Sequence, residues 1–169
     1  MCKRSHEADK MDALKKISIF KTLSPAGIEQ IARGTVFVSH RKKSIIFKEG
    51  EKSAFIYAIH SGLARTYKHA CSGEDVLSNI RGPGDMLNVD VVAGERFFMS
   101  AEALTDVALL RIERQRYCSV LFAFPEIALA VGAVLAKQID ELTRAAVILS
   151  EETNNKTGQV GFANNRKGP

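Results

Sequence analysis

The stretch Phe55-Ile56-Tyr57-Ala58-Ile59-His60-Ser61-Gly62 decides the fold class, because a short β-branched and aromatic run ends in a Ser-Gly turn. Similar runs recur on both sides of it: Thr35 to Val38, Ser44 to Phe47, Leu63 to Tyr67, Val76 to Ile80 and Val107 to Ile112. Gly50 and Ser72-Gly73 supply further turns. Many short strands at near-even spacing predict a mainly β fold, an antiparallel β-roll or jelly-roll, because parallel strands need helical crossovers that are missing here.

Helices are predicted to flank the roll. Ser24 can cap a short helix whose first turn takes Pro25 and which Gly34 ends. After Ile112 the pattern turns helical again, first over roughly Arg114 to Phe122 and then, restarted by Pro125, over a long segment to about Ser150.

The long predicted helix carries a heptad pattern. Its two seam positions are filled by Ala128, Leu135, Leu142 and Leu149 and by Gly132, Ile139 and Ala146. Lys137, Asp140, Glu141 and Arg144 are left for the flanks. The repeat favours a parallel two-helix dimer, and hence a homodimer. The alternative is that this face packs only on its own sheet.

Length and composition predict one compact domain with an appendage, since the chain has 169 residues of which 46% are apolar. We expect an N-terminal extension over 1–13, the roll over 14–124, the dimerisation helix over 125–150 and a flexible polar tail over 151–169. The net charge of +5 is dispersed in short runs, which favours solvated surface over a nucleic-acid patch.

The start of the chain predicts a cytoplasmic protein, because Met1 to Glu7 form no apolar leader. The apolar stretch from Ser119 to Ala136 approaches membrane-spanning length, but Pro125 and Glu126 interrupt it. A buried helical hairpin is the expected structure, with no membrane partner.

Four motifs in the roll suggest a family by their order and spacing. They are Ile46-Phe47-Lys48-Glu49-Gly50-Glu51, Tyr57-Ala58-Ile59-His60-Ser61-Gly62, Gly82-Pro83-Gly84-Asp85 and Met99-Ser100-Ala101-Glu102-Ala103-Leu104. Together with the long helix they resemble the effector domain of Crp/Fnr transcription regulators over residues 14 to 150. The resemblance implies a small-molecule effector pocket lined by Gly84, Asp85, Asn88, Val89, Asp90, Arg96, Met99, Ser100 and Ala101.

The resemblance also implies how cyclic-nucleotide-binding members hold their ligand, with a Gly-Glu pair on the ribose and an arginine on the phosphate. In this sequence Asn88-Val89 stands in place of the Gly-Glu pair, and Met99 stands in place of the arginine. Val89 has no acceptor and a thioether does not neutralise phosphate, so we expect no binding of cyclic AMP by these contacts. Arg96, three residues away, leaves a shifted contact open.

Asn88-Val89-Asp90 and the Ser100 to Leu104 motif are closer to the Fnr branch. Its oxygen-sensing members hold an iron–sulfur cluster on four thiolates. The three scattered cysteines, Cys2, Cys71 and Cys118, do not supply a conventional cluster. Haem stays an alternative, through His60, His69 or Cys71, although turn and surface roles explain these residues more simply. The effector and any cofactor stay unassigned.

Neither a metal-binding histidine pair nor a nucleophile motif stands out, so we expect no enzymatic activity and no metal site. Full-length relatives bind DNA through a helix-turn-helix module after the long helix. About twenty polar residues follow Leu149 here, so we expect no direct, specific DNA binding from this chain. Three explanations for the missing DNA-binding module stay open: the chain is a fragment, a frameshifted product or a stand-alone module. The competing hypothesis is a ligand-independent dimerisation module with a degenerate pocket.

Overall fold

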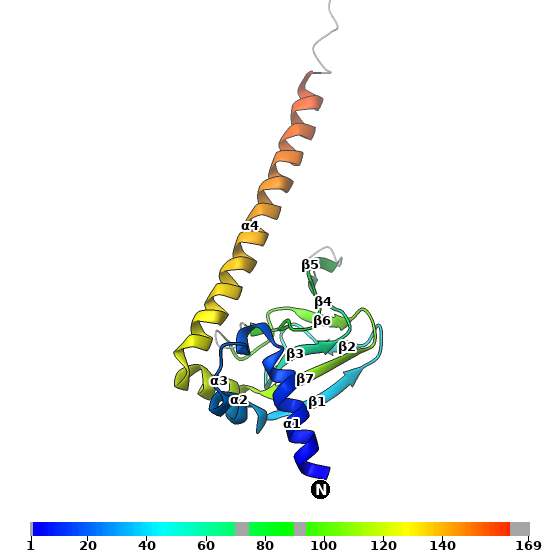
Figure 1. Cartoon of the computed structure of the whole chain (residues 1–169). Coiled ribbons are helices and arrows are strands. Elements are labelled where there is room, and N and C mark those ends of the chain that lie inside the picture. The colour runs from blue at the N-terminus through cyan, green and yellow to red at the C-terminus, as the bar shows by residue number, and fades with distance from the viewer. Residues whose placement is uncertain (1, 70–74, 90–93, 163–169) are drawn as a thin grey trace, which may run out of the picture. The chain divides into compact units, whose positions relative to one another are not determined.

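The computed structural model describes residues 2–69, 75–89 and 94–162, in two units formed by 1–132 and 133–169. Two antiparallel sheets build the first unit (Figure 1). One has the order β1-β7-β3 and the other β2-β6-β4-β5. The strands are β1 (Thr35–His40), β2 (Ile45–Phe47), β3 (Phe55–Ser61), β4 (Ala64–His69), β5 (Asp75–Arg81), β6 (Ser100–Ala103) and β7 (Val107–Glu113). The predicted antiparallel roll is confirmed; β6 is the strand that was not predicted.

The core lies between the two sheets. Ile59, Val107 and Leu109 from one sheet pack with Ala64, Ala101 and Ala103 from the other. The opposite face of the β1-β7-β3 sheet is buried as well, since Ile56, Ala58, Leu110 and Ile112 are 0% exposed. Helices α1, α2 and α3 contact this sheet. The sheet is therefore the middle layer of the unit, buried on both faces.

Helix α2 (Pro25–Ala32) begins as predicted: the Ser24 hydroxyl accepts a hydrogen bond from the Gly27 N–H at 3.3 Å, and Pro25 occupies the first turn. Helix α3 (Arg114–Ala123) and the restart at Pro125 are confirmed too. Two helical elements were not predicted. Helix α1 (Cys2–Lys15) occupies the expected extension, and a single 3-10 turn, η1 (Ser18–Phe20), follows it.

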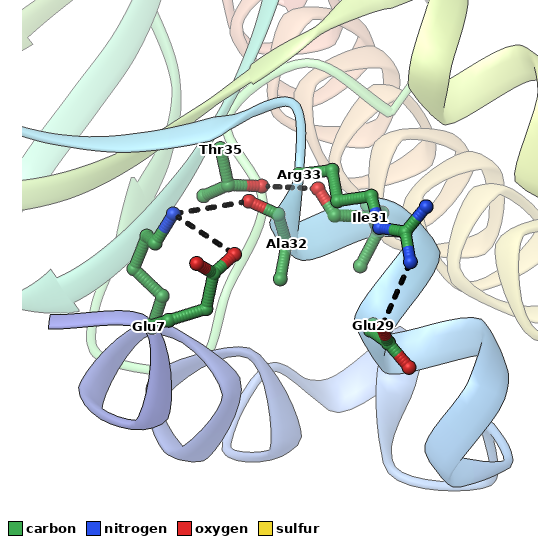
Figure 2. Close-up of polar contacts among 7 residues, drawn as sticks. Glu7, Glu29, Ile31, Ala32, Arg33 and Thr35 are labelled. Carbon is green, nitrogen blue, oxygen red and sulfur yellow. Dashed lines mark hydrogen bonds and ion pairs between the residues drawn. The ribbon is translucent and has the colours of Figure 1, made fainter. Parts of the chain in front are cut away.

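Polar contacts fix α1 and α2 to the start of β1 (Figure 2). The Lys10 ammonium donates to the carbonyl oxygen of Ala32 at 3.3 Å, and it lies 3.8 Å from the Glu7 carboxylate. The Thr35 hydroxyl donates to the Ile31 carbonyl at 2.7 Å. Carbonyls in the last turn of a helix lack intrahelical donors, and a cation there also suits the helix dipole. These contacts therefore close the C-terminal end of α2.

Helix α4 (Pro125–Phe162) continues past the predicted end at Ser150, so the expected tail from residue 151 is helical as far as Phe162. Helix elongation is cooperative, and no proline interrupts the chain between Pro125 and Pro169. Early in α4, Ile127 and Val131 are buried, at 0% and 5% exposure. No single helix among the described residues is long and apolar enough to cross a membrane, although α3 and α4 reach that mark as a bent pair.

Gly62 and Gly50 provide a matched test of the turns. Both have positive φ, +86° and +80°, but a Cβ on Gly62 would collide with the Asp106 carbonyl oxygen while one on Gly50 would meet open space. Gly50→Ala should lower the free energy of unfolding by about 1 kcal/mol through backbone strain alone. Gly62→Ala should cost at least about 2 kcal/mol more. Urea unfolding measures both, and equal losses would contradict the packing described for this turn.

Candidate functional site

The predicted effector loop joins β5 to β6, and its first part is a turn fixed to β3. The Gly84 N–H donates to the Ile59 carbonyl at 2.9 Å, and the Ile59 N–H donates to the Asp85 carbonyl at 2.8 Å. The Asp85 carboxylate accepts from the Gly82 N–H at 3.0 Å. Gly84 has φ +90°, which favours glycine. Gly84 and Asp85 therefore shape the turn, and the Asp85 carboxylate already has a backbone partner.

Asn88 and Val89 are buried, at 5% and 3% exposure. The Asn88 side-chain oxygen accepts from the Tyr57 N–H at 2.9 Å, and its amide nitrogen donates to the Phe55 carbonyl at 3.0 Å. Asn88 thereby replaces the strand partner that β3, an edge strand, lacks at this point. Asp90, the next predicted pocket residue, lies outside the described residues.

The second part of the loop pairs with the turn between β2 and β3. The Phe97 N–H donates to the Glu51 carbonyl at 3.0 Å, and the Gly50 N–H donates back to the Phe97 carbonyl at 2.9 Å. The exposed Arg96 donates from Nη1 to the Gly50 carbonyl at 2.6 Å. The arginine that the sequence left open as a shifted ligand contact thus binds backbone.

The remaining predicted pocket residues lie at the start of β6. Met99 is half-buried, whereas Ser100 and Ala101 are buried. The Ser100 hydroxyl accepts from the Glu49 N–H at 3.0 Å, and Ala101 belongs to the apolar core between the sheets. Of the predicted pocket residues that are described, Asp85, Asn88, Arg96 and Ser100 thus direct polar side-chain atoms to backbone groups.

An aromatic stack fills the interior of the roll beside this loop. The ring centroids of Phe47 and Phe97 are 4.0 Å apart with an interplanar angle of 13°, and Tyr57 stacks on Phe47 at 5.6 Å. Phe97 is 8% exposed. Burial raises the pKa of the Tyr57 phenol, while the nearby Arg111 guanidinium lowers it and the Glu51 carboxylate raises it. The sequence does not predict this stack, because one aromatic residue in a loop carries no periodic signal.

The described candidates for cofactor ligands lie on different elements. His60 makes an edge-to-face contact with Phe37, with centroids 5.4 Å apart, and Cys118 is half-buried on α3. His69 ends β4, and Cys71 lies outside the described residues. Within the described ranges, no group of three or more His, Cys, Asp or Glu side chains could hold a metal ion.

The predicted seam of α4 is open along most of its length. Ile139 is 65% exposed and Leu142 is 53% exposed. Ala128, Gly132 and Ala146 are also exposed, Leu135 is half-buried, and the side chain of Leu149 lies outside the described residues. The flanking charges pair within the helix, Lys137 with Glu141 at 3.8 Å and Asp140 with Arg144 at 3.0 Å. Ile127 and Val131, which are buried, are not members of the seam.

Phe97→Ala tests whether the aromatic stack supports the roll. Removing a buried ring should lower the free energy of unfolding by about 3 kcal/mol or more. Phe98→Ala is the matched control, because Phe98 is 48% exposed, and it should cost less than about 1 kcal/mol. Chemical denaturation reports both values, and a Phe97 variant as stable as the control would contradict the buried stack.

The sequence of this chain is similar to those of known proteins. The cyclic nucleotide-binding domain matches residues 37–123. The transcriptional activator protein Anr of Pseudomonas protegens is 22% identical over 113 residues, which are 67% of this chain and 46% of that protein. A CRP-like cAMP-activated global transcriptional regulator of Mycobacterium tuberculosis is 26% identical over 129 residues, 76% of this chain and 58% of its own length. The chain thus spans about half the length of such relatives.

The fold is also found in solved structures. The sensor domain of the transcriptional regulator DNR from Pseudomonas aeruginosa superposes with a TM-score of 0.70 at 18% identity, over 82% of this chain and 93% of that one. At this identity the likeness concerns the fold. The match to the domain family covers half of the chain, and the relatives include both Anr and a CRP-like regulator. The chain therefore belongs to the cyclic nucleotide-binding domain family, and it is similar to transcription regulators such as Anr and the CRP-like protein.

Proposed function

We propose that this chain is the effector-sensing and dimerisation module of a Crp/Fnr-like transcription regulator and that it forms a homodimer through α4. The observation that carries the proposal is the separation of two apolar faces on this helix. Ile127 and Val131 are buried, whereas the seam residues Ile139 and Leu142 leave more than half of their surface exposed. An exposed apolar seam with heptad spacing favours a second helix as its partner.

The seam also fits a parallel pair in its residue types. Leu135 and Leu142 occupy one heptad position and Ile139 the other, a combination that favours two-stranded coiled coils. Gly132 has open space where a Cβ would be, so a partner helix can approach closely there. The ion pairs of Lys137 and Asp140 with residues four positions later keep the flanks polar.

The roll does not fit a cyclic nucleotide held by an arginine and a glutamate. Val89 and Met99 occupy the matching positions, the Asn88 amide is engaged with Tyr57 and Phe55, and Arg96 is bonded to Gly50. The effector we propose is therefore not bound by the usual cyclic AMP contacts. Relatives of this group are transcription regulators, and we propose no enzymatic activity for this chain.

Calorimetric titration with cyclic AMP, cyclic GMP and cyclic di-GMP tests the nucleotide part of the proposal. We expect no heat of binding, because a phosphate would meet a thioether at Met99 in place of a guanidinium. An absorption spectrum of the anaerobically purified protein tests haem and iron–sulfur cofactors in the same preparation. Saturable binding of any of the three nucleotides would contradict the expected absence of binding.

A second candidate function is a ligand-independent dimerisation module. The aromatic stack favours it, since Phe97 and Phe47 occupy interior space with the chain's own side chains. This alternative predicts that dimer stability does not respond to any small molecule. The two functions share the seam and differ in whether the roll binds an effector.

Substitutions in the seam test the homodimer. Leu135→Asp and Leu142→Asp should convert the protein to a monomer, because a carboxylate would lose hydration at the centre of a helix pair. Ala133→Asp is the control, since this exposed alanine lies away from the seam and the substitution should leave the dimer intact. Sedimentation equilibrium at micromolar concentration gives the masses. A monomeric unmodified protein would show that the seam does not serve self-association.

A further inference from the structure

Arg111 is a charged residue within a strand that is otherwise buried. On β7 it stands opposite Val36 of β1 and Tyr57 of β3. Tyr57 and Leu109 belong to the face that packs toward the second sheet, and the two-residue alternation of a strand places Arg111 on that face. Arg111 itself is half-buried, and its neighbour Val36 on the edge strand is 45% exposed. The arginine thus lies on the inner face of the roll where this face opens to solvent.

The guanidinium of Arg111 has an aromatic neighbour and, in the part of the chain that the structure describes, no counter-ion. Its Cζ lies 4.5 Å from the centroid of the Phe55 ring. Among the described residues it forms no ion pair, and its buried Nε makes no hydrogen bond. A half-buried cation is normally paired, because partial desolvation of the charge is costly and an unmade hydrogen bond adds to that cost. Other partly buried arginines do find partners: Arg65 lies 2.6 Å from the Glu102 carboxylate.

The surroundings of Arg111 indicate which kind of ligand would pair with its guanidinium. Stacking on Phe55 holds the guanidinium plane, and its N–H groups project from the edges of that plane, which suits a two-oxygen acceptor. Phe55, Tyr57 and Val36 offer an apolar and aromatic wall, and the half-buried Tyr57 phenol, whose pKa burial raises, is neutral at pH 7 and can donate a hydrogen bond. Glu51 is the opposing group near Tyr57; one of its carboxylate oxygens accepts from the Lys48 N–H at 3.1 Å.

We propose that Arg111, with Tyr57 and Phe55, forms a binding site for a small oxyanion, a carboxylate or phosphate group carried on an apolar or aromatic body. If this site binds the effector of the roll, the effector is an anion of this kind, and that step rests on the proposed sensory function. The site uses a cation on β7, whereas the predicted effector pocket lies in the loop between β5 and β6 and at the start of β6.

Benzoate, phenyl phosphate and inorganic phosphate are the probes, added to the full chain at constant ionic strength. Benzoate or phenyl phosphate should raise Tm by about 5 °C at tenfold excess over its Kd. The first two probes distinguish a carboxylate from a phosphate, and inorganic phosphate shows how much the apolar body contributes. Absence of any rise with all three up to about 10 mM overturns the site.

Variants separate binding from support of the fold. Arg111→Met keeps the apolar stem over Phe55 and removes the charge, so it should abolish the probe effect while unfolding at the same or a higher Tm than the unmodified protein without probe. Glu51→Gln should tighten binding severalfold, because it removes a negative charge that acts on Tyr57 in the site. Arg33→Gln is the matched control: Arg33 pairs with Glu29 on the exposed surface, and its loss should leave binding unchanged.

Two outcomes contradict the proposal directly. If Arg111→Met retains the Tm rise, the anions stabilise the protein through its overall positive charge, and the site is overturned. If that variant fails to fold, Arg111 supports the structure, and titration of Arg111→Lys by calorimetry decides: retention of the unmodified affinity overturns the site, and a loss of about tenfold or more supports it. A dimer that binds no probe leaves the dimerisation module standing without this site, whereas a monomer that binds leaves the site standing without the dimer.

Discussion

Strand β7 is buried on both faces, and the rest of the first unit is arranged around this constraint. Leu109 and Leu110 point to opposite faces, and both are 0% exposed. Leu109 faces the second sheet. Leu110 lies on the opposite face of the β1-β7-β3 sheet, the sheet that helices α1 to α3 contact. A one-residue slip would exchange the two faces and turn Arg111 into a core position, so pairing with β1 and β3 fixes the register.

The described part of the loop between β5 and β6 has a structural role in this protein. Asn88, Arg96 and Ser100 bind backbone groups of Tyr57, Phe55, Gly50 and Glu49, and these partners lie 31 to 51 residues away in the chain. Each contact satisfies a backbone donor or acceptor that a turn or an edge strand leaves open. These side chains of the predicted effector pocket therefore hold distant segments of the chain together, and Phe97 stacks on Phe47 in the interior beside them. A polar effector would meet few free side-chain donors among the residues of this loop that the structure describes, whereas Arg111 offers its charge from the other sheet.

Helix α4 serves two surfaces with one sequence. Ile127 and Val131 are four residues apart and buried, and the seam through Ala128 and Gly132 lies one position further round the helix and is exposed. The shift of one position is about 100° on a helix, so the two apolar lines do not compete for the same partner.

The sequence by itself determined the elements whose signals are local. Ser24-Pro25 begins α2, Pro125 restarts the chain as α4, the Ser61-Gly62 turn separates β3 from β4, and the heptad spacing marks the seam. Capping, the fixed φ of proline and the freedom of glycine act within a few residues, so they can be read without a fold. Only the tertiary structure decided that the Asn88 amide serves β3, that Phe97 stacks on Phe47 and that Arg111 lies on the inner face without an ion pair among the described residues. These outcomes depend on strand register and on contacts between distant segments. In a strand buried on both faces, apolar residues follow one another without alternation, so the pattern does not tell the inner face from the outer one.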